Sequence, residues 1–311
     1  MEENVINFEK ILGECGVGEK TSLYVMKNFN KLEEYYTDDE LVKIYNYILQ
    51  NVETPELLIH VIKLADKYKN DETFEILKTM LESADCSSDG IIEVRIMCAK
   101  AVSNYKNQSA VTVFLKCLNN KYENYRIRLA CADALGRLGD RFAVPSLLNV
   151  VEDEDEKSVY LKESATFALG LLGDTSAIDP LVSLLEAKQG FFDKFSFLKE
   201  KIVEALGRLN TKNKKILRVL KGSLMDSSPI VRINAIEAIM NSDEENSADI
   251  IRPCLQDEDE EVRKNALIAL YNLNGRDILD EVLELPIYTE SLKAEAQSMI
   301  DEYESGDDDA G

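Results

Sequence analysis

The most regular feature of the chain is an apolar residue followed directly by a base, a pair that recurs seven times. Successive copies lie 30 to 37 residues apart. The copies are Val94-Arg95, Ile127-Arg128, Leu161-Lys162, Leu198-Lys199, Val231-Arg232, Val262-Arg263 and Leu292-Lys293. A self-similar period of this length is typical of stacked helical repeats, each too small to bury its own apolar face. The pattern therefore predicts a row of equivalent elements rather than a globule around one core.

The apolar positions that follow each pair have the period of an α-helix. After Leu161, small residues stand at Ala165 and Ala168 and a branched residue stands at Leu169, and the other copies follow the same offsets. These offsets place small and branched side chains on one stripe of a helix. We expect the small residues to lie where a neighbouring helix approaches closely.

Glycines mark the ends of these helices, and prolines mark the start of the next ones. Gly139 and Gly173 follow the last periodic residues, and a glycine there accepts the left-handed conformation that stops a helix. Pro145 and Pro180 follow shortly after, where a missing N–H in the first turn of a helix costs little. Each repeat is therefore predicted to be a pair of antiparallel helices, and the fold class is all-α.

These motifs resemble the HEAT-like repeats of the phycobilisome-lyase type. The consensus of that family runs through Ala-Leu-Gly-x-Leu-Gly-Asp, Ala-x-x-Pro-Leu, an acidic turn and Val-Arg. The similarity is close over residues 125–185, good over 226–275 and looser elsewhere. It implies a right-handed α-solenoid, a superhelix of stacked antiparallel helix pairs, with the second helix of every pair on the inner wall.

The family pattern also expects an acid in the turn before each base, and most copies have one six residues ahead of it. Tyr122 and Ile287 interrupt the series. The acids are Asp89, Glu156, Asp193, Asp226 and Asp257, and the bases are Arg95, Arg128, Lys162, Lys199, Arg232 and Arg263. We expect a ladder of acids and bases between neighbouring repeats, with a structural role in helix capping and register.

The chain divides into three parts by its pattern. Residues 1–90 show helical spacing but drift from the consensus, as expected of an N-terminal cap of degenerate repeats. Residues 91–303 form the repeat array. Residues 304–311 are a run of charges without an apolar face, which predicts a disordered acidic tail.

The composition of the chain disfavours some classes of partner. The 36 bases stand against 58 acids, giving a formal charge of −22, so the average field repels nucleic acid and anionic lipid. The N-terminal residues lack a signal-peptide pattern and no apolar run is long enough to cross a bilayer, which favours a cytoplasmic protein without a membrane partner. The six cysteines stand singly, as reduced thiols used as small apolar residues.

The search for catalytic or cofactor chemistry gives weak candidates. The Gly13–Thr21 segment resembles a phosphate-binding loop, but Glu19 stands where that motif needs lysine, so a turn between two helices is favoured. The single histidine, His60, is followed by Val61, whereas the di-iron site of deoxyhypusine hydroxylase, another HEAT-like protein, requires several His-Glu pairs. With His60 as the one histidine, the Ser-His and Cys-His pairs of common nucleophilic enzymes are also not expected. The prediction is a chain that is not an enzyme and has no cofactor or metal.

Two surfaces are candidates for binding a partner. One is the inner wall, where residues of mixed character lie three, six and ten places beyond each repeated apolar residue. Its candidates are Lys100, Asp133, Arg137, Phe167, Leu171, Lys201, Glu204, Arg208, Asn234 and Glu237. The other is the elongated turn containing Phe191 and Phe192, whose rings could anchor a partner or pack locally. Phe197 aligns with Tyr160 and Ile230 just before the helix, which predicts that this position is in the core.

Three functions follow from these observations. The first is a non-catalytic scaffold or adaptor that holds a protein or peptide, of basic character by charge, on its concave surface. The second, implied by the resemblance, is an accessory subunit of a phycobilin lyase. The third is a DNA glycosylase of the HEAT-like class, which the net charge disfavours.

Overall fold

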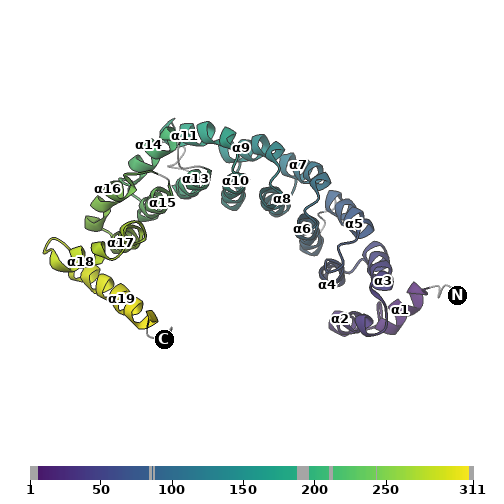
Figure 1. Cartoon of the computed structure of the whole chain (residues 1–311). Coiled ribbons are helices and arrows are strands. Elements are labelled where there is room, and N and C mark those ends of the chain that lie inside the picture. Colours follow the sequence, from purple (N-terminus) through teal and green to yellow (C-terminus); the bar gives the residue numbers. More distant parts are fainter. Residues whose placement is uncertain are drawn as a thin grey trace. The chain divides into compact units, whose positions relative to one another are not determined.

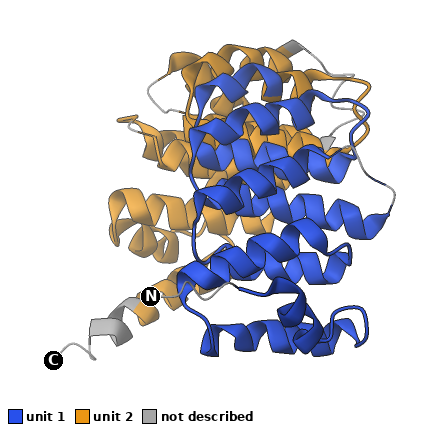
Figure 2. Cartoon of the chain, turned by 90° about the vertical axis from the view of Figure 1, so that its right-hand side faces the viewer, with its two compact units in different colours: residues 1–146 blue, residues 147–311 orange. Residues whose placement is uncertain are grey.

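The computed structural model describes residues 6–83, 86, 88–187, 196–209, 213–242 and 244–307. Within these ranges the regular elements are α-helices and short 3₁₀ helices, with no strand. The chain separates into two compact units, residues 1–146 and 147–311, which are coloured differently in Figure 2.

Unit 1 consists of stacked helix pairs (Figure 1). Its elements are α1 (Phe8–Cys15), α2 (Ser22–Lys31), η1 (Leu32–Glu34), α3 (Asp38–Asn51), α4 (Pro55–Ala65), α5 (Asp71–Glu82), α6 (Asp89–Asn104), η2 (Gln108–Ala110), α7 (Val111–Asn119), α8 (Tyr125–Leu138) and η3 (Arg141–Ala143). Helices α4, α6 and α8 pack side by side in one layer, and α3, α5 and α7 form the other layer. Helix α9 (Val144–Glu152) begins in unit 1 and ends in unit 2.

Unit 2 repeats the same arrangement. Its elements are α10 (Val159–Leu172), η4 (Thr175–Ala177), α11 (Ile178–Ala187), α13 (Ser196–Leu209), α14 (Lys214–Ser223), α15 (Pro229–Met240), α16 (Ser247–Ile251), η5 (Arg252–Gln256), α17 (Glu260–Asn274), α18 (Asp277–Glu284) and α19 (Glu290–Asp307). Helices α10, α13, α15 and α17 pack successively in the inner layer (Figure 1). Helices α11 and α14 lie in contact in the outer layer. The predicted all-α solenoid of helix pairs is confirmed.

Small residues allow the inner helices to approach closely, as the sequence predicts. Cys98, Cys131 and Ala165, which share one position of the repeat, are fully buried. A Cβ atom on Gly207 of α13 would lie 2.6 Å from the Cβ atom of Ala238 on α15, a separation that real side chains do not adopt. Glycine at this position therefore sets how closely α13 and α15 pack.

The predicted helix boundaries are also confirmed. Gly139 and Gly173 end α8 and α10 in the left-handed conformation, with φ angles of 74° and 63°. The Asp140 side chain accepts a hydrogen bond from the backbone N–H of Phe142. This N–H, at the start of the short helix η3, therefore has a hydrogen-bond partner. Pro145 then occupies the first turn of α9.

The N-terminal region is helical, as its apolar spacing predicts, and consists of α1 to α5 with the short η1. Gly16, with φ 82°, closes α1 and starts the turn that leads to α2, so the Gly13–Thr21 segment is a turn between helices. At the other end, α19 continues to Asp307, into the segment expected to be a disordered tail. Extending a helix that is already formed costs less than starting one. Residues 308–311 lie outside the described ranges.

Candidate functional site

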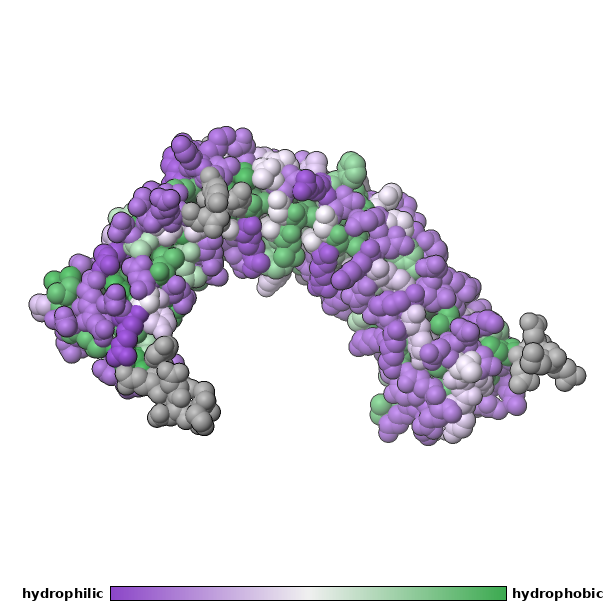
Figure 3. Space-filling view, in the orientation of Figure 1, coloured by the Kyte–Doolittle hydropathy of each residue, from purple (hydrophilic) through white to green (hydrophobic). Residues whose placement is uncertain are grey.

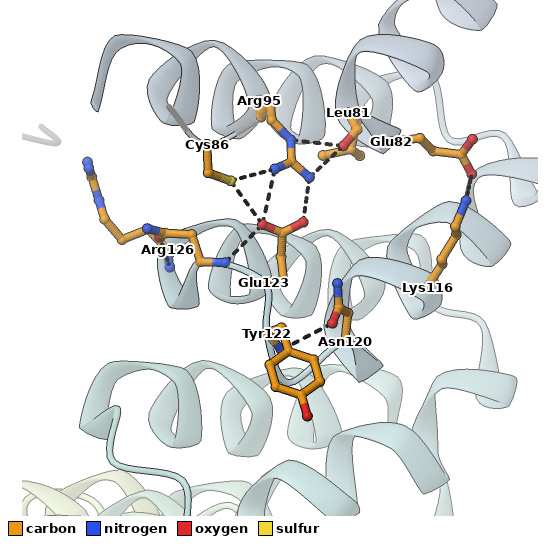
Figure 4. Close-up of polar contacts among 10 residues, drawn as sticks. Leu81, Glu82, Cys86, Arg95, Lys116, Asn120, Tyr122, Glu123 and Arg126 are labelled. Atoms are coloured by element: carbon orange, nitrogen blue, oxygen red, sulfur yellow. Dashed lines mark hydrogen bonds and ion pairs between the residues drawn. The ribbon is translucent and has the colours of Figure 1, made fainter. Parts of the chain in front are cut away.

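In unit 1, a buried ion pair joins two neighbouring repeats. Arg95 Nη2 lies 2.5 Å from Glu123 Oε2, and both side chains are almost completely buried (Figure 4). Burial alone would raise the pKa of Glu123, but hydrogen bonds from Arg95 and from the backbone N–H of Asn124 outweigh it and lower that pKa. The acid of this repeat is therefore present one residue after Tyr122, the position at which the sequence series breaks.

Unit 2 contains two pairs of the same kind. Lys199 forms an ion pair with Asp226, and Arg232 Nη2 lies 2.7 Å from Asp257 Oδ1. The hydrogen bond to Asp257 raises the pKa of Arg232. In each pair the base belongs to one repeat and the acid to the turn of the next, so the contact links consecutive helix pairs.

Bases of the ladder also bond within their own repeat. Arg95 donates to the carbonyl oxygen of Leu81, Arg128 donates to that of Leu118, and Arg263 donates to that of Asp257. Fully buried Lys162 donates to the carbonyl oxygens of Val150, Val151 and Asp153. These carbonyls lie at or just after the end of the first helix of the repeat, where they lack helical partners. The base therefore caps the C-terminus of that helix.

The acids of the ladder stabilise turns rather than act as helix N-caps. Glu156, Asp226 and Asp257 each accept the backbone N–H two residues further along the chain. The N-cap side chains come from other residues, such as Asp259 for α17 and Ser88 for α6, and Asp89 is the first residue of α6. Asp193 lies outside the described residues.

The inner layer of unit 2 has an exposed apolar patch at α10. The side chains of Phe167 and Leu171 are 38% and 42% exposed, although their neighbours Ala168 and Leu169 are fully buried. Large apolar groups on an otherwise polar helix face are typical of contact surfaces. Hydrophilic residues dominate the face drawn in Figure 3, where apolar residues form separate smaller areas.

Next to this patch, α13 carries a cluster of charges. Glu204 accepts from Lys201 Nζ at 3.1 Å and from Arg208 Nη2 at 3.2 Å. The guanidinium carbon of Arg208 lies 5.1 Å from the centroid of the Phe167 ring, a cation–π contact between α13 and α10. Four predicted inner-wall residues thus form one network of contacts, namely Lys201, Glu204, Arg208 and Phe167.

A pocket of about 520 Å³ lies between α13 and α15. Its lining residues are Glu204, Gly207, Arg208, Asn234, Glu237, Ala238 and Asn241. Asn234 Nδ2 donates to the backbone carbonyl oxygen of Glu200 at 3.1 Å, which fixes the side chain at the α13 edge of the pocket. Four of the inner-wall candidates in unit 2 therefore surround one cavity, and Asn241 is a fifth polar residue that was not predicted.

In unit 1 the inner-wall candidates lie on α6 and α8. Lys100 and Arg137 are exposed, and Asp133 is half-buried. Each side chain is thus at least partly accessible within its own unit. Phe191 and Phe192, the aromatic candidates of the elongated turn, lie outside the described residues.

One position was interpreted wrongly from the repeat alignment. Tyr160 and Ile230 are exposed, so the residue before each repeated apolar position does not belong to the core, and Phe197 is half-buried. This residue is at the start of the helix, one step away around the helix axis from the buried stripe. Its side chain therefore does not lie on that stripe.

His60 and the cysteines are the side chains considered for catalytic or metal chemistry. His60 Nε2 lies 2.8 Å from Asn30 Oδ1, and burial lowers its pKa, so it is a hydrogen-bonded structural side chain. The six cysteines are free thiols, and burial raises the pKa of Cys98 to about 12. Across the described ranges, no three His, Cys, Asp or Glu side chains gather as metal ligands would.

In the same ranges, no helix combines the length and the apolar character needed to span a bilayer.

Comparison with known proteins identifies relatives of the repeat array. The chain is 26% identical over 196 residues to phycocyanobilin lyase subunit alpha of a Picosynechococcus species, covering 57% of this chain and 70% of that protein. It is 24% identical over 236 residues to deoxyhypusine hydroxylase of Candida albicans, covering 75% of this chain and 63% of that protein.

The fold is shared with larger solenoids. The solved structure of Kap95p with RanGDP superimposes with a TM-score of 0.60 at 13% identity, covering 94% of this chain and 46% of that chain.

Two family models match the chain. The model of HEAT repeats matches residues 84–160 and 193–271, which together make up half of the chain. The model of the PBS lyase HEAT-like repeat matches residues 161–187. With its ladder of inter-repeat ion pairs and its two layers of helices, this chain belongs to the HEAT repeat family.

Proposed function

We propose that this protein is a non-catalytic HEAT-repeat scaffold that holds a segment of a protein partner against the inner helices of unit 2. The observation that supports this proposal is the exposure of Phe167 and Leu171 beside the Lys201–Glu204–Arg208 cluster. Apolar side chains surrounded by mixed charges fit a protein surface better than a polyanion. The formal charge of −22 favours a partner of basic character.

The ladder residues are not part of this binding surface. Arg95 and Arg232 are buried and engaged in contacts between and within repeats. Their role is to hold consecutive helix pairs in register, and the inner wall depends on that spacing. Binding is therefore assigned to the inner helices and stability to the ladder.

The proposal is tested by affinity capture from an extract of the native host, with the full chain immobilised. The double variant Phe167→Ser, Leu171→Ser should lose a specific bound protein that the wild type retains. Met225→Ser is the matched control, because Met225 is 87% exposed in the turn between α14 and α15 of the same unit. Retention of the same proteins by the double variant would contradict the proposal.

A second candidate is an accessory subunit of a phycobilin lyase. The observation in its favour is the similarity to phycocyanobilin lyase subunit alpha. A shifted absorbance band on mixing the chain with phycocyanobilin and an apo-phycobiliprotein would support this function. An unchanged spectrum, with a protein partner captured in the previous experiment, favours the scaffold.

The DNA glycosylase hypothesis is weaker, because the excess of acids repels the phosphate backbone. A salt-sensitive mobility shift of duplex DNA in the presence of the protein would support the DNA glycosylase hypothesis.

A further inference from the structure

The negative charge of the chain is concentrated in unit 2. Residues 147–311 hold 35 acids against 18 bases, a difference of −17, whereas residues 1–146 hold 23 acids against 18 bases, a difference of −5. The field around unit 2 therefore attracts cationic groups more strongly than the field around unit 1.

Within unit 2, the pocket between α13 and α15 contains one carboxylate that is not neutralised. Glu204 is bound by Lys201 and Arg208, whereas the exposed Glu237 forms no ion pair with any described residue. Arg208 is held by Glu204 and by the Phe167 ring. The basic side chain that lines the pocket is thus already engaged, and Glu237 stays available.

Further acceptors lie beside Glu237. The Asn234 amide nitrogen is used on the Glu200 carbonyl, which leaves its Oδ1 atom as an acceptor at the pocket edge. Asn241 also lines the pocket. Gly207 and Ala238 form a floor of small residues, so the space above them is not filled by side chains of the protein. A guanidinium group has five N–H donors in a planar fork and matches such a set of acceptors better than a single ammonium group.

We propose that this pocket receives an arginine side chain of the protein partner, while Phe167 and Leu171 receive an apolar side chain of the same segment. This inference rests on the proposed function and specifies the chemistry of its partner. Helices α10, α13 and α15 pack in succession, at about 8–10 Å between neighbouring axes. An extended chain covers about 3.3 Å per residue, so the apolar residue and the arginine lie about five or six residues apart.

The experiment uses the immobilised full chain and a display library of random 12-residue linear peptides. Enriched peptides are synthesised with a fluorophore, and their dissociation constants are measured by fluorescence anisotropy. We expect enrichment of an arginine with a leucine or phenylalanine about five or six positions away. The affinity should fall as sodium chloride rises, because the pocket is open to solvent.

Variants then locate the contact. Glu237→Ala should weaken binding about tenfold, and Glu237→Gln should do the same without shortening the side chain. Glu284→Ala is the matched control, since it removes the same charge from an exposed helical position of unit 2 outside the pocket. Replacing the peptide's arginine by citrulline should weaken binding equally, and Glu237→Ala should then have no further effect. Circular dichroism shows that each variant is folded.

The outcomes separate this inference from the proposed function. If arginine is not enriched, or if Glu237→Ala and Glu284→Ala bind equally well, the arginine pocket is wrong. Loss of binding by Phe167→Ser in that case leaves the scaffold function standing. If no peptide is enriched over the bare support, the arginine pocket is overturned and the capture experiment decides the scaffold function. If neither Glu237→Ala nor Phe167→Ser alters binding, both proposals are overturned.

Discussion

Arg232 of one repeat donates to Asp257 of the next, with 2.7 Å between Nη2 and Oδ1, while its Nη1 donates to the carbonyl oxygen of Asp226 within its own repeat. The guanidinium side chain is 5% exposed and the carboxylate side chain is 13% exposed. One side chain thus fixes both the turn of its own repeat and the position of the following one.

Replacing Arg232 by methionine should lower the free energy of unfolding by about 3 kcal/mol, because Asp257 and the Asp226 carbonyl lose their donor in a poorly solvated place. Urea unfolding followed by circular dichroism measures the change. Lys215→Met is the control, since the Lys215–Asp179 pair is exposed on both sides and should contribute less than about 1 kcal/mol. Equal effects of the two substitutions would show that burial of the Arg232 pair adds no stability.

Gly207→Ala should destabilise unit 2 by about 1–3 kcal/mol, because the new methyl group would meet Ala238 at 2.6 Å and push α13 and α15 apart. Gly222→Ala is the matched change. That glycine is on α14, where an added methyl group would meet open space, so alanine should be neutral or stabilise the helix by up to about 1 kcal/mol. Thermal unfolding of the two variants, compared with the wild type, checks the difference in sign.

The Arg95–Glu123 pair should make stability depend on acid pH. The pKa of Glu123 is lowered in the folded state. The ionised carboxylate therefore adds to the free energy of unfolding at pH values above its pKa in the unfolded chain, about 4.3. This stabilisation is lost as the pH falls through the lower pKa of the folded state. Glu123→Gln should therefore shift the urea midpoint most at neutral pH, and the difference from the wild type should shrink below about pH 4. A constant difference across this range would mean that Glu123 does not titrate in this way.

Cys86 should be the one fast-reacting thiol of the six in the folded protein. It is exposed, whereas the other five cysteines are buried. Burial, followed by the hydrogen bond to Glu123, raises the pKa of Cys86, so its rate with Ellman's reagent should increase with pH up to and beyond the ordinary thiol range. Denaturation in urea should expose all six. More than one fast thiol under native conditions would contradict the buried positions, and Cys86→Ser should abolish the fast phase.

The sequence predicts the fold well because each repeat carries its own helix signals. Gly139 and Gly173 stop helices, Pro145 starts one, and the small residues of one stripe are buried as expected. These features depend on neighbours a few residues away in the chain. They can therefore be read without knowledge of tertiary contacts.

The candidate surface was harder to predict. Phe167, Glu204 and Arg208 could be placed on the inner wall by their spacing, but their mutual contacts depend on how far one helix slides along another. Glu123 was missed because the turn before α8 places its acid one residue later than the other repeats do. The exposure of Tyr160 was also misjudged, since periodicity does not show where a helix leaves the core.

The bases of the ladder bond to the end of the preceding helix and to the turn that follows. Each such contact therefore joins segments separated by no more than about the length of a repeat. A whole helix pair could be inserted into such an array or removed from it by gene duplication or deletion, and the new neighbours would find matching partners at the junction. The length of the inner wall thus depends on the number of helix pairs and not on a single central core.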